Sequence, residues 1–236
     1  MRERAAVTVW EGYGFTEACP VVASTLATGR AKPNCIGGPV PGVELQLRDT
    51  ALHEPVDDGA PGGGYLTEDG PGEIWVRGAN LFSGYWPDGA DGPDAEGWLA
   101  TGDLAYADED GDLHLVDRRS DLILVSGFNV YPAEVERVLD AHPAVAESAV
   151  IGVPDPQTGA TVRAVVALRP GAQLGFEELR EHAAASLARY KVPTSVQVLA
   201  ALPHSLTGKV SRARLRELGL AHAEESADDL GGDGER

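Results

Sequence analysis

The pattern of hydrophobic and polar residues changes near residue 117. Before it, short apolar or alternating runs are separated by turns rich in glycine and proline, for example at residues 37–39, 61–64 and 71–72. Short alternating runs between such turns are typical of strands in a meandering or barrel-like sheet. The pattern predicts strands at residues 43–47, 73–77 and 113–116.

The second part of the chain alternates between helix and strand patterns. Pro132 opens a run in which Val135, Val138 and Leu139 recur on one face, and this spacing predicts a helix. A similar repeat predicts a second helix over residues 176–187. The remaining expected elements are strands at residues 147–153, 162–168 and 195–199 and a last helix at residues 211–218.

These patterns divide the chain into three segments. Residues 1–117 are expected to be β-rich, and residues 118–220 to form one compact α+β domain of ordinary size. Residues 221–236 carry acidic residues and glycines with little to bury, so we expect a disordered acidic tail. The fold class expected for the whole chain is therefore α/β together with a β-rich, barrel-like subdomain.

Composition narrows the classes of function. The 236 residues are 43% hydrophobic, enough for a buried core, and contain neither a long apolar run nor a signal-peptide pattern, so a cytoplasmic protein without a membrane span is expected. A net charge of −18 disfavours nucleic-acid binding, because that affinity depends on basic residues. Cys19 and Cys35 make no disulfide framework, and the six histidines are scattered, so neither a structural zinc nor a haem is expected.

A loop at residues 11–17 has the chemistry of a nucleotide contact. Gly12 and Gly14 let the backbone approach a ligand, and Tyr13 offers a ring for stacking. Thr16 can donate a hydrogen bond to phosphate, and Glu17 is a hard oxygen ligand suited to Mg²⁺. A short glycine-rich loop is by itself more often a plain turn between strand and loop, so the loop gains its meaning from the rest of the chain.

Five blocks occur in an order and spacing that resemble those of AMP-forming acyl-CoA synthetases. Any one block is weak, but five over nearly the whole chain identify it as a member of that family. Within the family the chain is most similar to medium- and long-chain fatty-acid–CoA ligases. The blocks are GYGFTE at residues 12–17, GEIWVRG with GYW at 72–78 and 84–86, WLATGDL at 98–104, DRRSD through SGFNVYP at 117–132, and LPHSLTGKV at 202–210.

The resemblance implies a fold and a set of roles. Residues 1–117 would be part of the large adenylate-binding domain, and residues 118–220 the C-terminal lid. Asp103 would accept hydrogen bonds from both ribose hydroxyls, and Arg118 would contact ribose or phosphate. Without the family, Asp103 is equally well a turn residue, and Arg118 is more commonly a surface partner of Asp117 or Asp121.

The lid carries the remaining implied roles. Lys209 would stabilise the charge that develops as acyl-AMP forms, and Gly127 would leave room for the pantetheine arm of CoA. The alternatives are a solvated turn at Lys209 and an ordinary β-turn at Gly127. Where the family usually has aspartate or lysine at the lid pivot, this chain has Ser120. We expect rotation to survive that change, with thioesterification equal to that of a Ser120→Lys variant.

The implied activity has two half-reactions. A carboxylate, of which a fatty acid is preferred, reacts with ATP to give acyl-AMP and pyrophosphate, and the CoA thiol then displaces AMP. The catalytic residues would be Lys209, Glu17 and Thr16, with Mg²⁺ on Glu17. The nucleotide would be bound by residues Gly12, Tyr13, Gly14, Thr16, Asp103, Arg118 and Gly127.

The family's phosphate-gripping loop is expected upstream of residue 12 and is not found in these 236 residues. The chain is therefore expected to be truncated and to need a complementing N-terminal chain. Two alternatives stay open. One is a non-catalytic interaction module derived from the family, and the other is an adenylating enzyme that loads a carrier-protein thiol in place of CoA.

Overall fold

The computed structural model describes residues 7–49 and 71–218. It separates into two compact units that divide between Ser120 and Asp121, a few residues beyond the change in sequence pattern at residue 117. The tail expected at residues 221–236 lies outside the described residues.

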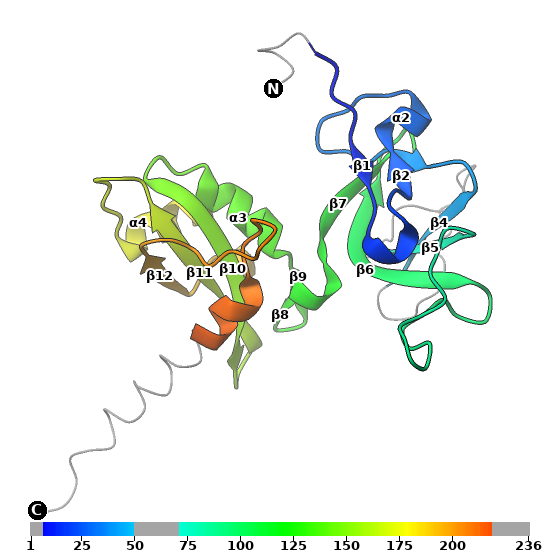
Figure 1. Ribbon diagram of the computed structural model, residues 1–236. Helices are drawn as coiled ribbons and strands as arrows, with labels where there is room; N and C mark the ends of the chain where they lie inside the picture. The colour runs from blue at the N-terminus through cyan, green and yellow to red at the C-terminus, as the bar shows by residue number, and fades with distance from the viewer. Residues whose placement is uncertain (1–6, 50–70, 219–236) are drawn as a thin grey trace, which may run out of the picture. The chain divides into compact units, whose positions relative to one another are not determined.

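The first unit is built on an antiparallel sheet in the order β4-β5-β6-β7 (Figure 1). Cross-strand pairs such as Leu47 with Ile74 and Val76 with Leu99 place apolar side chains on one face, where they are buried. This alternation is what the sequence pattern predicts for a sheet with one face in the core. The strands are β4 (Val43–Arg48), β5 (Gly72–Gly78), β6 (Trp98–Ala107) and β7 (Leu113–Arg118).

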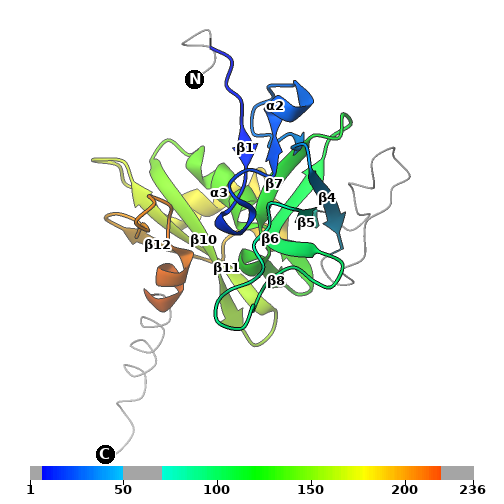
Figure 2. The ribbon, with the colours of Figure 1, turned by 45° about the vertical axis from the view of Figure 1, so that its right-hand side comes forward.

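A small second sheet covers the apolar face of the first. The antiparallel strands β1 (Gly12–Tyr13), β2 (Ala23–Ser24) and β3 (Gly38–Pro39) run beside it, with the short helices η1 (Thr16–Ala18) and α2 (Thr25–Thr28) between them (Figures 1 and 2). Tyr13, Val22 and Ile36 pack with Leu47 and Ile74 in one core. The glycine-rich loop that follows β1 is therefore fixed to the larger sheet by hydrophobic burial.

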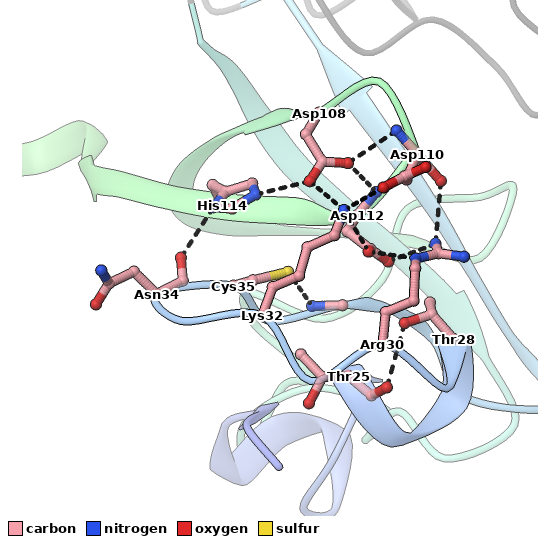
Figure 3. Close-up of polar contacts among 11 residues, drawn as sticks. Thr25, Thr28, Arg30, Lys32, Asn34, Cys35, Asp108, Asp110, Asp112 and His114 are labelled. Atoms are coloured by element: carbon pink, nitrogen blue, oxygen red, sulfur yellow. Dashed lines mark hydrogen bonds and ion pairs between the residues drawn. The ribbon is translucent and has the colours of Figure 1, made fainter. Parts of the chain in front are cut away.

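The turn between β6 and β7 is joined to the loop after α2 by charged side chains (Figure 3). The Lys32 ammonium lies 2.6 Å from Asp108, 2.7 Å from Asp110 and 3.0 Å from Asp112. Arg30 binds the fully buried Asp112 carboxylate through two nitrogens, at 2.7 and 2.8 Å. These bonds connect segments that are about 80 residues apart in the sequence.

The second unit is an α+β domain around a three-stranded sheet in the order β10-β11-β12. Strand β10 (Val145–Asp155) pairs antiparallel with β11 (Gly159–Leu168), and β11 pairs parallel with β12 (Ser195–Leu199). The parallel pair requires a crossover connection, which contains α4 (Phe176–Ala184) and η3 (Arg189–Lys191). Helix α3 (Pro132–Asp140) begins at Pro132, as predicted.

This sheet is buried on both faces. Val150, Ala164 and Val166 point to the side where α3 and α4 pack. The alternate residues Ile151 and Val165 point to the other side, where Leu202 and Leu215 of the C-terminal segment cover them. The two-residue period of the strands thus separates two cores, and residues 212–218 form the expected last helix.

Several elements differ from the sequence-based expectation, and the short elements β1, β2, β3 and α2 are among those that were not predicted. Helix α4 ends at Ala184 rather than at residue 187, although Leu187 stays buried through a closing turn in which its amide bonds to Ala183 O at 2.9 Å. Strand β6 and the hairpin of β8 (Ile123–Val125) and β9 (Phe128–Val130) were not predicted. Among the described residues, no helix combines the length and apolar character that crossing a bilayer requires.

Candidate functional site

A cavity of about 350 Å³ opens in the first unit beside strand β6. Its lining includes Glu17, Tyr85, Thr101, Asp103 and Arg118. All five residues lie in the sequence blocks, and three of them, Glu17, Asp103 and Arg118, are predicted site residues. The cavity therefore brings together side chains that are about 100 positions apart along the chain.

Asp103 reaches the cavity because strand β6 bulges at this point. Trp75 pairs with Ala100 and Glu73 pairs with Leu104, so three residues of β6 stand opposite Ile74 alone. Gly102 at the centre has a positive φ of 73°, which favours glycine. Extra residues in one strand turn side chains out of the regular alternation. The bulge thereby aims the carboxylate of Asp103 at the cavity.

Two groups from other strands bind the Asp103 carboxylate. The Tyr13 hydroxyl donates a hydrogen bond of 2.6 Å to Oδ2, and Arg118 Nε lies 3.3 Å from Oδ1. Arg118 stands directly opposite Asp103 in the β6–β7 register. Burial, aided by the Asp103 charge, raises the pKa of Tyr13 above its ordinary value, so the phenol stays a donor. In the part of the chain that the structure describes, the Arg118 guanidinium pairs with Asp103, while Asp117 accepts a hydrogen bond from the Arg118 backbone amide at 2.8 Å.

Arg118 and Asp103 differ in their access to solvent. The Arg118 side chain is 67% exposed, whereas that of Asp103 is 16% exposed. An ion pair with one partner so exposed adds little to stability. The guanidinium therefore has donors left for an anionic group in the cavity, next to a carboxylate with acceptor capacity.

Glu17, which also lines the cavity, accepts a short hydrogen bond from the Tyr85 hydroxyl. This bond lowers the pKa of Glu17, so the group is an anion near neutral pH. Tyr85 is itself held by Phe82, whose ring meets it edge to face at 5.0 Å. The carboxylate predicted to hold Mg²⁺ is thus charged and lines the cavity, while Thr16 is exposed and is not among the lining residues.

The two glycines of this loop have different constraints. A Cβ on Gly14 would lie 1.7 Å from Pro20 O, so no other residue fits without moving the backbone. A Cβ on Gly12 would meet Ala23 O at 3.6 Å, an ordinary contact. Close packing therefore requires glycine at position 14, whereas at position 12 the structure gives no such steric reason.

Only one cluster of carboxylates in the described residues has the spacing of a metal site, and it is the turn of Asp108, Asp110 and Asp112 rather than Glu17. The Lys32 ammonium contacts all three carboxylates. Lys32 and Arg30 already offset two of the three negative charges that a cation would neutralise. This cluster therefore holds the fold together and is distinct from the cavity.

The second unit contains the two site residues predicted for the lid. Gly127 and Ser126 form the two-residue turn of the β8–β9 hairpin, with φ of 84° and 51°. Positive φ at both positions is required by the tight hairpin turn that matches strand twist. A Cβ on Gly127 would meet nothing within 4 Å, so the requirement for glycine is conformational and the space beside it is open.

Lys209 lies in a hairpin-like loop between Pro203 and Ser211. The loop is closed by a bond from Ser205 N to Lys209 O at 2.7 Å and one from Ser211 N to Pro203 O at 2.8 Å. Gly208 has a φ of 79°, which turns the chain immediately before the lysine. Lys209 is exposed, and within the described parts of the chain its ammonium has no ion-pair partner. The loop thus presents a free cation on a closed backbone.

Sequence reasoning missed several residues around the cavity. The sequence motifs contain Glu73, Thr101 and Tyr85 but assign them no role. In the structure, Glu73 is only 2% exposed and accepts a hydrogen bond from the Gly102 amide. The signal available for Glu73 was a carboxylate between apolar residues within a strand, because a buried charge requires partners.

In a comparison with known proteins, each unit matches a protein-family model. The family model described as AMP-binding enzyme matches residues 1–86, and the model described as AMP-binding enzyme C-terminal domain matches residues 134–209. The chain is similar to a long-chain-fatty-acid–CoA ligase of Yersinia pestis, with 46% identity over 209 residues. That match covers 88% of this chain and 35% of the relative, so the chain spans about a third of the length of such curated relatives.

Solved structures of adenylate-forming enzymes share the fold of this chain. ATP-bound MatB from Rhodopseudomonas palustris superposes with a TM-score of 0.80 at 34% identity, covering 92% of this chain and 42% of that one. The o-succinylbenzoate CoA synthetase MenE from Bacillus subtilis, in complex with an acyl-adenylate, gives a TM-score of 0.74 at 32% identity, covering 91% and 42%. The expected fold class is confirmed. The chain belongs to the AMP-binding enzyme family, with matches to both the AMP-binding enzyme model and its C-terminal domain model.

Proposed function

We propose that this chain supplies the ribose-binding half of the nucleotide site and the catalytic lid of an AMP-forming acid–CoA ligase. The observation that supports this most strongly is the arrangement at Asp103. The Asp103 carboxylate lies on the β6 bulge and lines a cavity of about 350 Å³. It is bound by the Tyr13 hydroxyl and the Arg118 guanidinium.

This arrangement suits the ribose and phosphate of an adenylate. A carboxylate has two acceptor oxygens and can bind two neighbouring ribose hydroxyls. Arg118 has donors in a fixed fork that match phosphate or ribose oxygens. On ligand binding, Tyr13 keeps Asp103 oriented, because its raised pKa keeps the phenol protonated.

The cation proposed for the reaction is Mg²⁺. Glu17 fits it as a single hard carboxylate ligand that is ionised near neutral pH. Mg²⁺ commonly binds one or two carboxylates and completes its shell with waters and substrate phosphates. When bound, the ion would neutralise phosphate charge as pyrophosphate leaves. The task of Glu17 is then to hold it beside the cavity.

For the second unit we propose two successive roles. Lys209 stabilises negative charge while the carboxylate attacks the α-phosphate of ATP and pyrophosphate leaves. Gly127 provides open space for the pantetheine arm while the CoA thiolate attacks the acyl carbon and AMP leaves. The two roles require rotation of the unit, which follows from the family resemblance.

A fatty acid is the proposed acyl substrate, because a relative at 46% identity is named a long-chain-fatty-acid–CoA ligase. The test is acid-dependent exchange between ATP and labelled pyrophosphate, with a panel of fatty and aromatic acids. Because the chain spans 35% of that relative, exchange is measured with the purified chain alone and with the relative's N-terminal portion added as a second polypeptide.

The control is Lys209→Ala, whose loop is closed by backbone bonds and is therefore expected to keep its shape. Fatty-acid-dependent exchange that is lost in the control supports the proposal. Exchange that never occurs in either condition contradicts it and favours an interaction module. A competition between CoA and a carrier-protein thiol for the acyl-adenylate separates the two acceptors.

A further inference from the structure

A buried carboxylate stands behind the cavity and is not explained by the roles above. Glu73 lies on β5 and is only 2% exposed. A buried charge is costly unless several donors satisfy it. Its partners therefore indicate what the residue does.

The first partner is the β6 bulge. Because Thr101, Gly102 and Asp103 stand opposite Ile74 alone, the regular exchange of bonds between the strands is interrupted here. Side chains replace it. Glu73 Oε1 accepts from the Gly102 amide at 3.1 Å, and the Thr101 hydroxyl donates to Ile74 O at 2.9 Å and accepts from the Asp103 amide at 3.1 Å. Buried backbone amides require such partners.

The second partner of Glu73 is Arg119, which is the neighbour in sequence of the cavity residue Arg118. Glu73 Oε2 binds Arg119 Nη1 at 3.1 Å, and Arg119 follows Arg118 directly. One buried side chain thus joins the bulge that carries Asp103 to the end of the strand that carries Arg118. The two residues are opposite each other in the register, so fixing both segments fixes their separation.

We propose that Glu73 is a positioning residue for nucleotide binding, which holds the Gly102 amide with one carboxylate oxygen and Arg119 with the other, so that Asp103 and Arg118 face the ligand together. The proposal rests on the proposed function, because it assigns Glu73 to the same nucleotide site. Glu73 does not touch the ligand. It acts by limiting the conformations of the two segments that do.

The experiment compares Glu73→Gln and Glu73→Ala with a matched control, Glu44→Gln. Glu44 also binds an arginine in this sheet, with Arg77 Nη2 at 2.6 Å, but it is exposed and does not line the cavity. Two quantities are measured on the full chain. They are amide hydrogen exchange at Gly102 relative to Val76, and the Kd for AMP by calorimetry.

In Glu73→Ala we expect exchange at Gly102 to accelerate at least about tenfold more than at Val76, with a smaller effect in Glu73→Gln and none in the control. We expect the Kd for AMP to rise about tenfold in Glu73→Gln. Equal acceleration at both amides would mean a purely global loss of stability and would overturn the proposal. So would an unchanged Kd in Glu73→Gln.

The two hypotheses fail separately. A wild-type chain that binds no AMP contradicts the proposed function in this chain. The exchange at Gly102 still decides whether Glu73 positions the bulge, because that readout needs no nucleotide. If Glu73→Ala does not fold, Glu73→Gln, which keeps the shape of the side chain, carries both measurements.

Discussion

Replacing Asp112 by asparagine tests the charged network of the first unit at its most buried member. The Asp112 side chain is fully buried, and it accepts two bonds from Arg30 and lies 3.0 Å from Lys32 (Figure 3). The substitution keeps the shape of the side chain and removes its charge. Arg30 and Lys32 are then left with a neutral partner that accepts more weakly.

The expected cost follows from burial. Removing one charge of a fully buried pair costs about 3–5 kcal/mol. Because the Arg30 side chain is 41% exposed, water recovers part of that loss, and we expect about 2 kcal/mol. For a unit of this size that corresponds to a melting midpoint lower by roughly 8 °C. The matched control is Asp110→Asn, whose side chain is 59% exposed and for which we expect less than about 0.5 kcal/mol.

Tryptophan fluorescence reports on this unit alone, because all four tryptophans, Trp10, Trp75, Trp86 and Trp98, precede Ser120. Thermal unfolding followed at these residues gives the midpoint for each variant. Equal midpoints for Asp112→Asn and Asp110→Asn would refute the reasoning, because burial would then not decide the contribution.

The contribution of Asp112 to stability also depends on pH. Burial would raise the pKa of Asp112, but bonds from Arg30 and Lys32 hold it below its ordinary value. Its contribution is thus present above about pH 4 and is lost in acid.

Two further predictions concern the hydrogen bond of Tyr13 and the ion pairs of the lysines. Because the pKa of Tyr13 is raised, its contribution to stability is present below about pH 10 and falls at higher pH. Urea unfolding followed by tryptophan fluorescence from about pH 8 to 11 should therefore show a shallower decline in the free energy of unfolding for Tyr13→Phe than for the wild type. An identical decline in the two proteins would contradict this prediction. Among the lysines, amine acetylation followed by peptide mass spectrometry should modify Lys209 first, because Lys191 is bound by Glu134 and hydrogen bonds to Asp108 raise the pKa of Lys32. Lys32 reacting as fast as Lys209 would refute the assignment.

Much of the second unit could be predicted because its elements follow simple periods. The alternation in β10 and β11 and the helical repeat in α3 and α4 all bury apolar residues in the two cores. Strand β6 was missed because Thr101, Gly102 and Asp103 interrupt its alternation. Glycine between two polar residues is typical of a turn. Here the same residues form a bulge within a strand, and only the pairing with β5 shows this.

The cavity could be predicted in part. Asp103, Arg118 and Glu17 could be named from motifs, and the structure lines one cavity with all three. Their supporting groups could not be named, because each is fixed by a contact between distant positions. Tyr85 meets Glu17 across 68 residues, and Glu73 meets Gly102 across 29. No local pattern contains such a contact.

The residues around Ser120 combine these observations. Arg119 is tied to the buried Glu73 of the first unit. Asp121 is tied to Arg212 at 3.2 Å and to Arg216 at 2.6 Å, both in the C-terminal segment of the second unit. In the parts of the chain that the structure describes, the Ser120 side chain has no hydrogen-bond partner. Side chains therefore restrain the chain on both sides of Ser120 but not at that residue. A rotation between the units would then concentrate in the backbone torsions of Ser120, whatever its side chain, which is the physical reason to expect that serine can serve where the family usually has aspartate or lysine.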